Sequence, residues 1–478
     1  MIVPPTPRHP HEGRDLGPEF NIARIGGPGG VWRSVAVFDG TVYALSDIAG
    51  GHSLVTLSET GQALTDFAQR SALVLDGGGT LDVYHKRGDT VEVDRSSFDG
   101  TTWRTQASSY DQLSPTTIRS DSSDHLAVYA KRLYPGLSEF IPAADGKILG
   151  EHRWRDRLTG RPLIYGDRIW YLRERWPNQE LIARDEQGDV ITALTLPPGH
   201  LGSIASDGTT VAGVWNDAYT AATGVIATSF EALAESLSRH ANDPVYQESA
   251  CYAYSAKTVD TIPVGIYEPD TPAVGTIVML HGGPHSTSWP ANQPLVSYLA
   301  RQGWRVAVPN ICSSSLAERY HLCEELGSDD AREVATLARH FQARGPVVVL
   351  GISYGVYVGA RAVSLDAPID GLIAMSGFMT ASSLDSSSHP MVVALRTKHR
   401  LPETDAAKLR RVPTIVVHGR RDVRVPVASQ RKAAEDIAAL DFVELAEEGH
   451  EIKSDRAVAT AYPRIASWLS ATQVSMAR

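Results

Sequence analysis

Three residues in the C-terminal half have the types and the order that nucleophilic catalysis needs. Ser353 lies in GISYG, between the apolar run VVVL and a helix-like run, which is the strand–turn–helix setting of a nucleophile elbow. Asp422 follows the strand-like TIVV, and His450 follows the strand-like FVEL. A serine hydroxyl needs a base and the base needs an orienting carboxylate, in this setting in the order serine, acid, histidine. The sequence therefore predicts a catalytic triad at the carboxyl edge of one sheet.

The G-x-S-x-G pattern by itself also fits a purely structural turn, so the acid and the histidine carry the argument. His418 lies too close to its own strand to swing to the serine, and we expect it to have a structural role. Asp370 precedes a strand and would lie at the opposite edge of the sheet. Asp422 and His450 are therefore the partners that the chain order favours.

Acyl transfer also needs two N–H groups that bind the oxyanion. One should be the backbone N–H of Tyr354, at the positive end of the helix that follows the nucleophile. The other should come from the turn HGGPHSTSW, whose two glycines let the backbone point an N–H inward, and Gly283 is the expected donor. His285 in the same turn is a possible substrate contact.

From about residue 246 the chain alternates strand-like and helix-like segments. The expected strands are TIVML (276–280), RVAV (305–308), VVVL (347–350), GLIAM (371–375), TIVV (414–417) and FVEL (442–445). In 329–341 the apolar residues recur every three or four positions, which predicts a helix with one buried face, and 429–440 and 454–470 behave likewise. Continuous apolar strands joined by helices predict a mostly parallel, doubly wound sheet.

The N-terminal half has a different pattern, with short strand-like bursts separated by Gly, Asp, Asn and Ser turns. Aromatic residues end five of these bursts at intervals of 41 to 45 residues: Tyr43, Tyr84, Tyr129, Tyr171 and Trp215. The first four are followed 16 to 18 residues later by a turn glycine: Gly61, Gly100, Gly146 and Gly188. This period predicts a short β-propeller of about five blades, the fifth incomplete. A β-sandwich with regular strand spacing is the alternative.

The length of 478 residues favours two domains. We expect an N-terminal segment (1–20), a β-propeller-like domain (21–236), a linker (237–245) and a catalytic domain (246–478). The formal net charge of -10 argues against nucleic-acid binding. Three cysteines are too few for a disulfide framework or a zinc site, and no signal peptide or apolar run of about 18 residues is evident. The expectation is a cytoplasmic protein with no metal, no cofactor and no membrane span.

Four motifs, in this order, resemble the prolyl oligopeptidase family of serine peptidases, and its acylaminoacyl and dipeptidyl peptidases in particular. They are HGGP (281–284), GISYG (351–355), HGRRDVRVP (418–426) and EEGH (447–450). The resemblance implies an α/β-hydrolase domain with a β-propeller cap that limits access to short peptides. It implies Ser353 as nucleophile, Asp422 as acid and His450 as base, with Gly283 and Tyr354 as oxyanion donors. Family members often assemble, so a homo-oligomer is compatible with it.

Two features depart from the family pattern. The N-terminal half has room for about five blades, whereas propellers in the family commonly have seven or eight. After RVAV the chain reads NICSSSLAERY, with Asn310 in place but Cys312 where the family usually has arginine and Ser313 where it has glycine. That loop should lie near the substrate, so Asn310 and Cys312 join His285 as possible substrate-side residues.

The expected function is a serine hydrolase or peptidase that cleaves short peptides or aminoacyl amides through an acyl-enzyme intermediate. The altered loop and the short propeller also fit an acyl transferase or macrocyclase, in which an amine captures the acyl group, or an esterase acting on a specialised metabolite. A protein of another class, a catalytically silent propeller that binds a partner, is a further alternative, and the complete triad argues against it.

Overall fold

The computed structural model describes the chain in two compact units. One consists of residues 1–249 with 289–292, and the other of residues 250–288 with 293–478. Up to Asp156 the description covers the backbones of the strands, and from Leu163 to Met476 it covers the chain except 167, 186, 207, 244–246, 248–249, 317–318, 320–322, 438–440 and 453. The predicted N-terminal segment 1–20 lies outside the described residues. The second unit, which carries the predicted triad, is called the catalytic unit below.

The catalytic unit is built on one eight-stranded sheet with the strand order β21-β22-β24-β23-β25-β26-β27-β28. Its strands are β21 (Tyr252–Val259), β22 (Ile262–Pro269), β23 (Thr276–Leu280), β24 (Arg305–Pro309), β25 (Val347–Ile352), β26 (Gly371–Met375), β27 (Thr414–Gly419) and β28 (Asp441–Leu445). β22 runs antiparallel to β21 and β24, and the strands from β24 to β28 are parallel. All six predicted strands are confirmed, and β21 and β22 are added at one edge.

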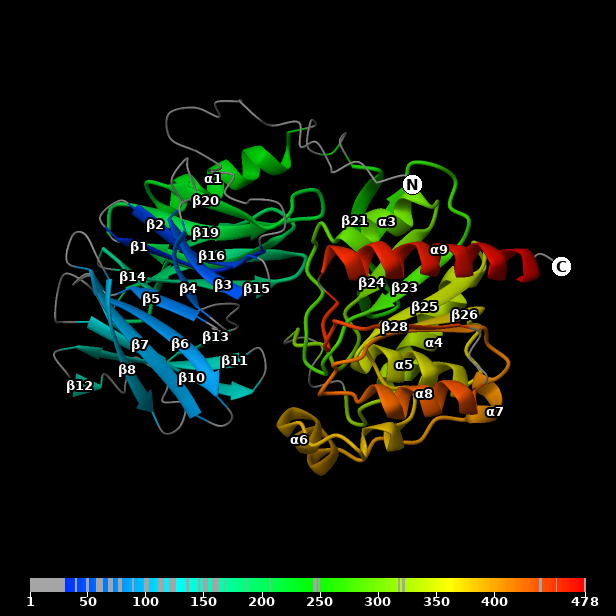
Figure 1. Ribbon diagram of the computed structural model, residues 1–478. Helices are drawn as coiled ribbons and strands as arrows, with labels where there is room; N and C mark the ends of the chain where they lie inside the picture. The colour runs from blue at the N-terminus through cyan, green and yellow to red at the C-terminus, as the bar shows by residue number, and fades with distance from the viewer. Residues whose placement is uncertain are drawn as a thin grey trace. The chain divides into compact units, whose positions relative to one another are not determined.

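Helices cover both faces of this sheet (Figure 1). They are α3 (Pro294–Arg301), α4 (Asp329–Gln342), α5 (Tyr354–Ser364), α6 (Pro390–Lys398), α7 (Ala406–Leu409), α8 (Val427–Asp436) and α9 (Asp455–Met476). α3 and α9 contact each other on one face, whereas α4, α5 and α8 share a core cluster on the other. The predicted apolar face of α4 is buried, because Ala331, Val334 and Ala338 have no exposed surface. The doubly wound arrangement is therefore confirmed.

The described strands of the N-terminal unit form five separate antiparallel sheets of consecutive strands. The strands of the first three sheets are β1 (Val31–Phe38), β2 (Thr41–Ile48), β3 (Gly51–Thr56) and β4 (Ala63–Phe67); β5 (Ala72–Leu75), β6 (Thr80–Arg87), β7 (Thr90–Phe98) and β8 (Trp103–Tyr110); and β9 (Thr116–Arg119), β10 (Leu126–Tyr134), β11 (Leu137–Ala144), β12 (Lys147–Ile148) and β13 (Trp154–Asp156). The strands of the last two are β14 (Leu163–Tyr165), β15 (Arg168–Arg175), β16 (Asn178–Arg184) and β17 (Val190–Thr195); and β18 (His200–Ser206), β19 (Val211–Asn216) and β20 (Thr223–Ala227).

The sequence repeat coincides with these sheets. Each of the five repeat aromatics lies in the second strand of its own sheet, namely in β2, β6, β10, β15 or β19. The turn glycines fall between the third and fourth strands, and Gly188 there has φ +89°. The last repeat lacks this glycine, and the last sheet has three strands. A sandwich would have two packed sheets, whereas the described strands of this unit form five.

The first strands of neighbouring sheets lie close together. β1 contacts β5, and β14 contacts both β9 and β18. β1 also contacts β18 and β19, so the first sheet lies beside the last. Strands that are far apart in the sequence therefore meet within this unit.

A helix follows the last sheet, where the sequence analysis expected β structure up to 236 and a linker over 237–245. α1 (Phe230–Ala241) begins after Ser229, whose hydroxyl accepts a hydrogen bond from the N–H of Ala232. Phe230 stacks on Trp170 at 4.7 Å, and the core it joins also contains Leu233 and Leu237. The first part of the expected linker is thus the last turn of a packed helix. The apolar spacing of this helix was a signal that the strand-based interpretation missed.

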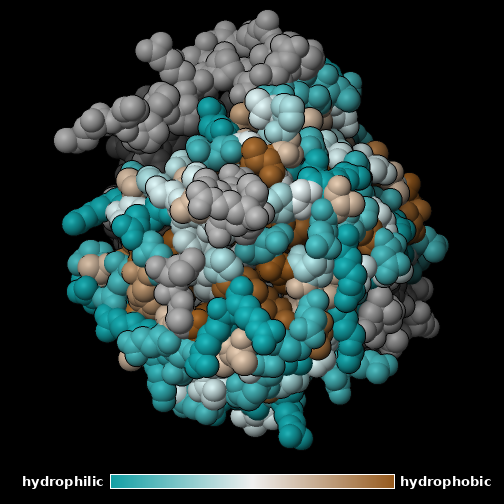
Figure 2. Space-filling model, turned by 90° about the vertical axis from the view of Figure 1, so that its right-hand side faces the viewer, coloured by the Kyte–Doolittle hydropathy of each residue, from teal (hydrophilic) through white to brown (hydrophobic). Residues whose placement is uncertain are grey.

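The face of the molecule drawn in Figure 2 is mostly hydrophilic, with hydrophobic residues visible mainly between hydrophilic ones. Within the described residues, every helix is too short or too polar to cross a membrane. Among the described residues, many buried apolar side chains gather in a core cluster around α4, α5 and α8 and in another between α1 and the last two sheets of the N-terminal unit.

Helix α5 approaches the sheet so closely that only glycine fits at its second position. A Cβ on Gly355 would lie 2.7 Å from the carbonyl oxygen of Leu280 and 2.8 Å from that of His281. Both atoms belong to the backbone and cannot rotate away. The glycine in the GISYG motif is therefore required by the packing of α5 against the end of β23.

Gly355→Ala is expected to lower the free energy of unfolding by about 2 to 3 kcal/mol, because the added methyl group overlaps backbone atoms. Gly449→Ala is the matched control, since a Cβ there would lie 3.8 Å from the nearest atom. Its effect should stay below about 0.5 kcal/mol. Chemical unfolding of both variants checks this, and equal stabilities would contradict the close approach.

Candidate active site

Ser353 occupies a strained turn between β25 and α5. Its φ of +53° and ψ of -116° lie in a region of backbone conformation that residues other than glycine rarely adopt. The turn is held by a hydrogen bond of 3.0 Å from the N–H of Ser353 to the carbonyl oxygen of Met375 on β26. This conformation is that of a nucleophile elbow, which places the hydroxyl at the carboxyl edge of the sheet.

The three predicted triad residues meet through two hydrogen bonds. His450 Nε2 lies 2.9 Å from Ser353 Oγ, and His450 Nδ1 lies 2.8 Å from Asp422 Oδ2. A carboxylate only accepts, so Nδ1 carries the proton and Nε2 is left to accept from the serine hydroxyl. Asp422 follows β27 and His450 follows β28, which brings both to the edge where Ser353 lies. The geometry is that of a base poised to deprotonate a serine.

Asp422 is held in place from several directions. Its Oδ1 accepts from the backbone N–H groups of Arg424 and Val425, at 2.8 and 2.9 Å. Burial alone would raise the pKa of Asp422, but hydrogen bonds from His418, His450 and Val425 outweigh burial and hold that pKa well below its ordinary value. The carboxylate therefore stays ionised at any pH at which the protein works.

His418 is structural, as the sequence analysis expected. Its side chain is fully buried, and its Nε2 lies 2.8 Å from the carbonyl oxygen of Val425 and 3.3 Å from Asp422 Oδ2. The carbonyl must accept, so Nε2 carries a proton directed at the Asp422 loop. His418 thus fixes the acid rather than competing for the serine.

One expected oxyanion donor follows Ser353 directly in the chain, and the other belongs to a turn beside it. Tyr354 is the first residue of α5, so its N–H has no partner within the helix and lies at the positive end of the helix dipole. Gly283 has φ +139° and lines a cavity together with Gly282 and Ser353. A Cβ on Gly282 would lie only 3.2 Å from that of Ser353, so this turn passes directly beside the nucleophile.

A cavity of about 920 Å³ opens at Ser353 and His450. Its apolar lining residues are Met279, Pro284, Pro294, Leu295, Ile352, Met375, Phe378, Leu384, Met391, Val392, Leu395, Val425, Ile452 and Tyr462. Its charged or titratable lining residues beyond the triad are His285, Lys398, His399, Arg424 and Glu451. The cavity can therefore hold a mainly apolar group against the nucleophile, with polar side chains at a few points.

The three possible substrate-side residues have different positions. His285 lines the cavity, with φ +72°. Asn310 is fully buried away from it, and its amide bonds both the N–H and the carbonyl of Ser288. Cys312 is also buried, and its thiol donates to Asp330 at 3.3 Å. The expectation for Asn310 and Cys312 is therefore corrected, because their polar groups bind the protein's own loops.

The sequence analysis missed several residues at this site. Ser376 lines the cavity, is buried with φ +44°, and its hydroxyl has no hydrogen-bond partner among the described residues. It follows β26 directly, and its place at a strand's carboxyl end was a usable signal. Phe378 and the cavity-lining residues of α6 gave no such signal, because an apolar residue outside a periodic pattern does not reveal which way it faces.

Possible metal-ligand atoms of Cys312, Cys323 and Asp330 lie within 4.8 Å of one another in the part of the chain that the structure describes.

Comparisons with known proteins agree with this fold. Residues 275–402 match the family described as alpha/beta hydrolase fold. The chain is similar in structure to a puromycin-hydrolyzing peptidase of Mycobacterium tuberculosis (16% identity, TM-score 0.62, 93% of this chain and 79% of that chain). It is also similar to an acylaminoacyl peptidase of Pyrococcus horikoshii (11%, 0.61, 90% and 86%) and to oligopeptidase B of Leishmania major (11%, 0.56, 92% and 71%).

These identities are low, so the likeness concerns the fold. No curated protein matches the chain by sequence. The catalytic unit has the α/β-hydrolase fold, and structures similar to most of the chain include those of an acylaminoacyl peptidase, a puromycin hydrolase and oligopeptidase B.

Asp422→Asn should slow the reaction of Ser353 with a fluorophosphonate probe by about 10³- to 10⁴-fold at neutral pH, because the amide no longer holds His450 in the required tautomer. Asp370→Asn is the matched control. Asp370 also accepts a backbone hydrogen bond, from Val347 at 2.8 Å, but it lies at the opposite edge of the sheet. Labelling rates by mass spectrometry check this, and a wild-type rate in the Asp422 variant would contradict the assigned role.

Proposed function

We propose that this chain is a serine peptidase or amidase of the prolyl oligopeptidase type, acting on short peptides or aminoacyl amides. The observation that carries the proposal is the hydrogen-bonded series from Ser353 through His450 to Asp422, on a nucleophile elbow beside a mainly apolar cavity. The hydrolase fold alone would leave the reaction open, because one fold hosts many chemistries.

In the proposed reaction Ser353 Oγ attacks the substrate carbonyl as His450 Nε2 takes the hydroxyl proton. The tetrahedral oxyanion is held by the backbone N–H groups of Tyr354 and Gly283. His450 then gives its proton to the leaving amine, and an acyl group remains on Ser353. Water, deprotonated by His450, releases the acid and restores the serine. Asp422 stabilises the charged imidazole in both halves.

The substrate class rests on the cavity and on the structural relatives. Fourteen of the cavity's lining residues are apolar, which favours a hydrophobic side chain or blocking group next to the cleaved bond. One relative is a puromycin-hydrolyzing peptidase, and an acylaminoacyl peptidase has been solved in complex with Z-Gly-Gly-Phe-chloromethyl ketone. Both names point to small amide or peptide substrates of those proteins, and we extend that class to this chain.

We also propose that the N-terminal unit is a five-bladed β-propeller. Three observations support it: five consecutive antiparallel sheets, first strands that lie beside one another, and contact of β1 with β18 and β19. A ring closed in this way would make each sheet one blade. The three-stranded last sheet would be the incomplete fifth blade that the sequence repeat predicted.

A substrate panel tests the proposed reaction. It contains chromogenic amides and esters of single and paired amino acids with free or acylated amino ends, together with puromycin. Wild-type protein should cleave amides, with a preference for hydrophobic residues, and Ser353→Ala should lower kcat by about 10⁴-fold or more. Activity retained in the Ser353 variant would sink the mechanism.

The same panel separates the alternatives. Products that carry an added amine would indicate an acyl transferase, and cleavage of esters alone would indicate an esterase. Failure of a fluorophosphonate to label Ser353 in folded protein would favour a silent binding protein. The ratio of acylated to free substrates would then assign the enzyme to acylaminoacyl peptidase-like or aminopeptidase-like use.

Val392 offers a test of the cavity itself. Its side chain is buried and lines the cavity, whereas that of Val393, next on α6, is 44% exposed and does not. Val392→Thr should lower kcat/KM for hydrophobic substrates about 5- to 20-fold, because a hydroxyl replaces a methyl group in the apolar wall. Val393→Thr should have little effect. Equal kinetics in the two variants would place the substrate elsewhere.

A further inference from the structure

Asp330 is a fully buried carboxylate at the start of α4 and does not line the cavity. Its two oxygens accept four hydrogen bonds. Oδ1 accepts from the N–H of Ser313 at 3.0 Å and from the thiol of Cys312 at 3.3 Å. Oδ2 accepts from the hydroxyl of Tyr354 at 2.7 Å and from the N–H of Gly327 at 3.0 Å. Because all four partners are donors, the group acts as a carboxylate.

Oδ2 of Asp330 holds Tyr354, the residue that follows Ser353. Tyr354 is fully buried, and burial, followed by the charge of Asp330, raises the pKa of its hydroxyl well above the ordinary value. The hydroxyl therefore remains a donor at every working pH. Since the side chain and the backbone N–H belong to one residue, this bond restrains the orientation of the N–H that follows Ser353.

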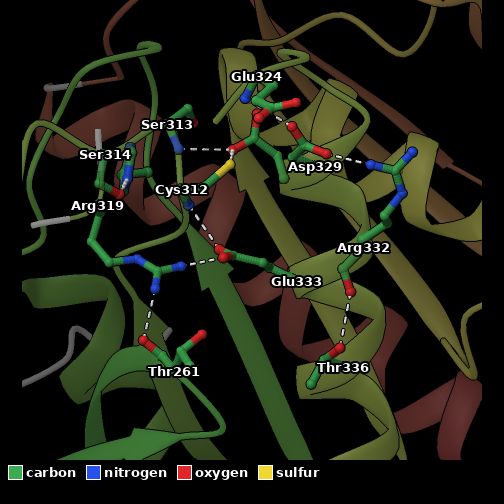
Figure 3. Close-up of polar contacts among 12 residues, drawn as sticks. Thr261, Cys312, Ser313, Ser314, Arg319, Glu324, Asp329, Arg332, Glu333 and Thr336 are labelled. Carbon is green, nitrogen blue, oxygen red and sulfur yellow. Dashed lines mark hydrogen bonds and ion pairs between the residues drawn. The ribbon is translucent and has the colours of Figure 1, made fainter. Parts of the chain in front are cut away.

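Oδ1 of Asp330 holds the loop that begins at Cys312. A hydrogen bond with Cys323, followed by burial, raises the pKa of the Cys312 thiol, so the thiol also remains protonated. Figure 3 shows this loop beside α4, with Glu333 between Cys312 and Arg319. The N–H of Cys312 donates to Glu333 at 2.7 Å, and Arg319 pairs with the same carboxylate. Two acidic residues of α4 thus hold the loop.

That loop in turn holds the glycine turn of the active site. The N–H of His285 donates to the carbonyl of Ser313 at 2.9 Å, and the N–H of Ser315 donates to the carbonyl of Ser286 at 2.9 Å. On the other side of Gly283, His281 Nε2 lies 2.6 Å from the hydroxyl of Ser314. Burial lowers the pKa of His281, so its neutral ring accepts there while Nδ1 donates to the carbonyl of Gly282 at 2.6 Å.

We propose that Asp330 is the positioning residue of the oxyanion hole, joining its two halves through one buried carboxylate. One oxygen restrains Tyr354 directly, and the other restrains the turn around Gly283 through residues 313–315. Asp330 does not touch substrate. It sets the separation and direction of two N–H groups that must match the oxyanion closely in the transition state. This inference rests on the proposed function, because it assigns those N–H groups to an oxyanion.

A pair of tyrosine variants provides the sharpest test. Tyr354→Phe removes only the hydroxyl that bonds Asp330. Tyr357→Phe, one turn along α5, removes a hydroxyl that donates to the carbonyl of Pro402 at 2.7 Å and has no part in the network. Tyr354→Phe should lower kcat about 10-fold with KM changed less than twofold, because the loss falls on the transition state. Tyr357→Phe should leave both constants within twofold.

Asp330→Asn is the second arm. An amide of the same shape has one accepting atom, so one side of the network faces a donor instead of an acceptor. We expect kcat to fall about 10- to 100-fold with a small change in KM. The shape of the pH–rate profile should be unchanged, because the triad keeps its partners. Rates are divided by the number of sites that a fluorophosphonate labels, which removes the contribution of misfolded protein.

The outcomes separate this inference from the proposed function. If Ser353→Ala is inactive while Tyr354→Phe matches Tyr357→Phe and Asp330→Asn has a wild-type kcat, the positioning role is overturned and the hydrolase survives. Should Asp330→Asn fail to fold, the tyrosine pair decides alone. A fall in kcat that is confined to Tyr354→Phe and Asp330→Asn supports the inference. If Ser353→Ala remains active, the proposed function fails first.

Discussion

The strained turn at Ser353 depends on the absence of side chains where α5 meets the sheet. The methyl group of an alanine at Gly355 would overlap the backbone oxygens of Leu280 and His281, and a Cβ on Gly377 would overlap Val356 and the carbonyl oxygen of Ser353. These close approaches restrict the backbone between β25 and α5, where Ser353 has a positive φ. The packing of the surrounding core thereby offsets the unfavourable backbone conformation of Ser353.

Parallel strands convert this local turn into a site. Residues that follow the carboxyl ends of β25, β27 and β28 are distant in sequence, yet the register of the sheet brings Ser353, Asp422 and His450 within hydrogen-bond reach. Each loop is then restrained separately. His418 and two backbone N–H groups hold the acid, while Asp330 holds the loops that flank the nucleophile. The three triad side chains are thus positioned by partners that do not line the cavity apart from Arg424 and Val425 of the Asp422 loop.

Much of this could be predicted because the signals are local. Apolar strands, the elbow and the order of serine, acid and histidine are each visible in short segments, and the repeat aromatics mark one strand in every N-terminal sheet. The sequence did not predict the direction in which loop side chains point. Asn310 and Cys312 follow β24 as expected, but whether a loop side chain turns toward the cavity or the core is set by distant partners such as Ser288 and Asp330. α1 was missed because a strand-rich context concealed its helical spacing.

The contact of β1 with β18 and β19 has a consequence for how the N-terminal unit forms. Its first strand finds these neighbours only after about 170 further residues have been made, since β18 begins at His200. Contacts of such long sequence separation cost loop-closure entropy and slow folding. During synthesis the first sheet therefore lacks these packing neighbours until the last sheet emerges. The assembly of this unit is set by the arrival of its final strands rather than by the speed of any single hairpin.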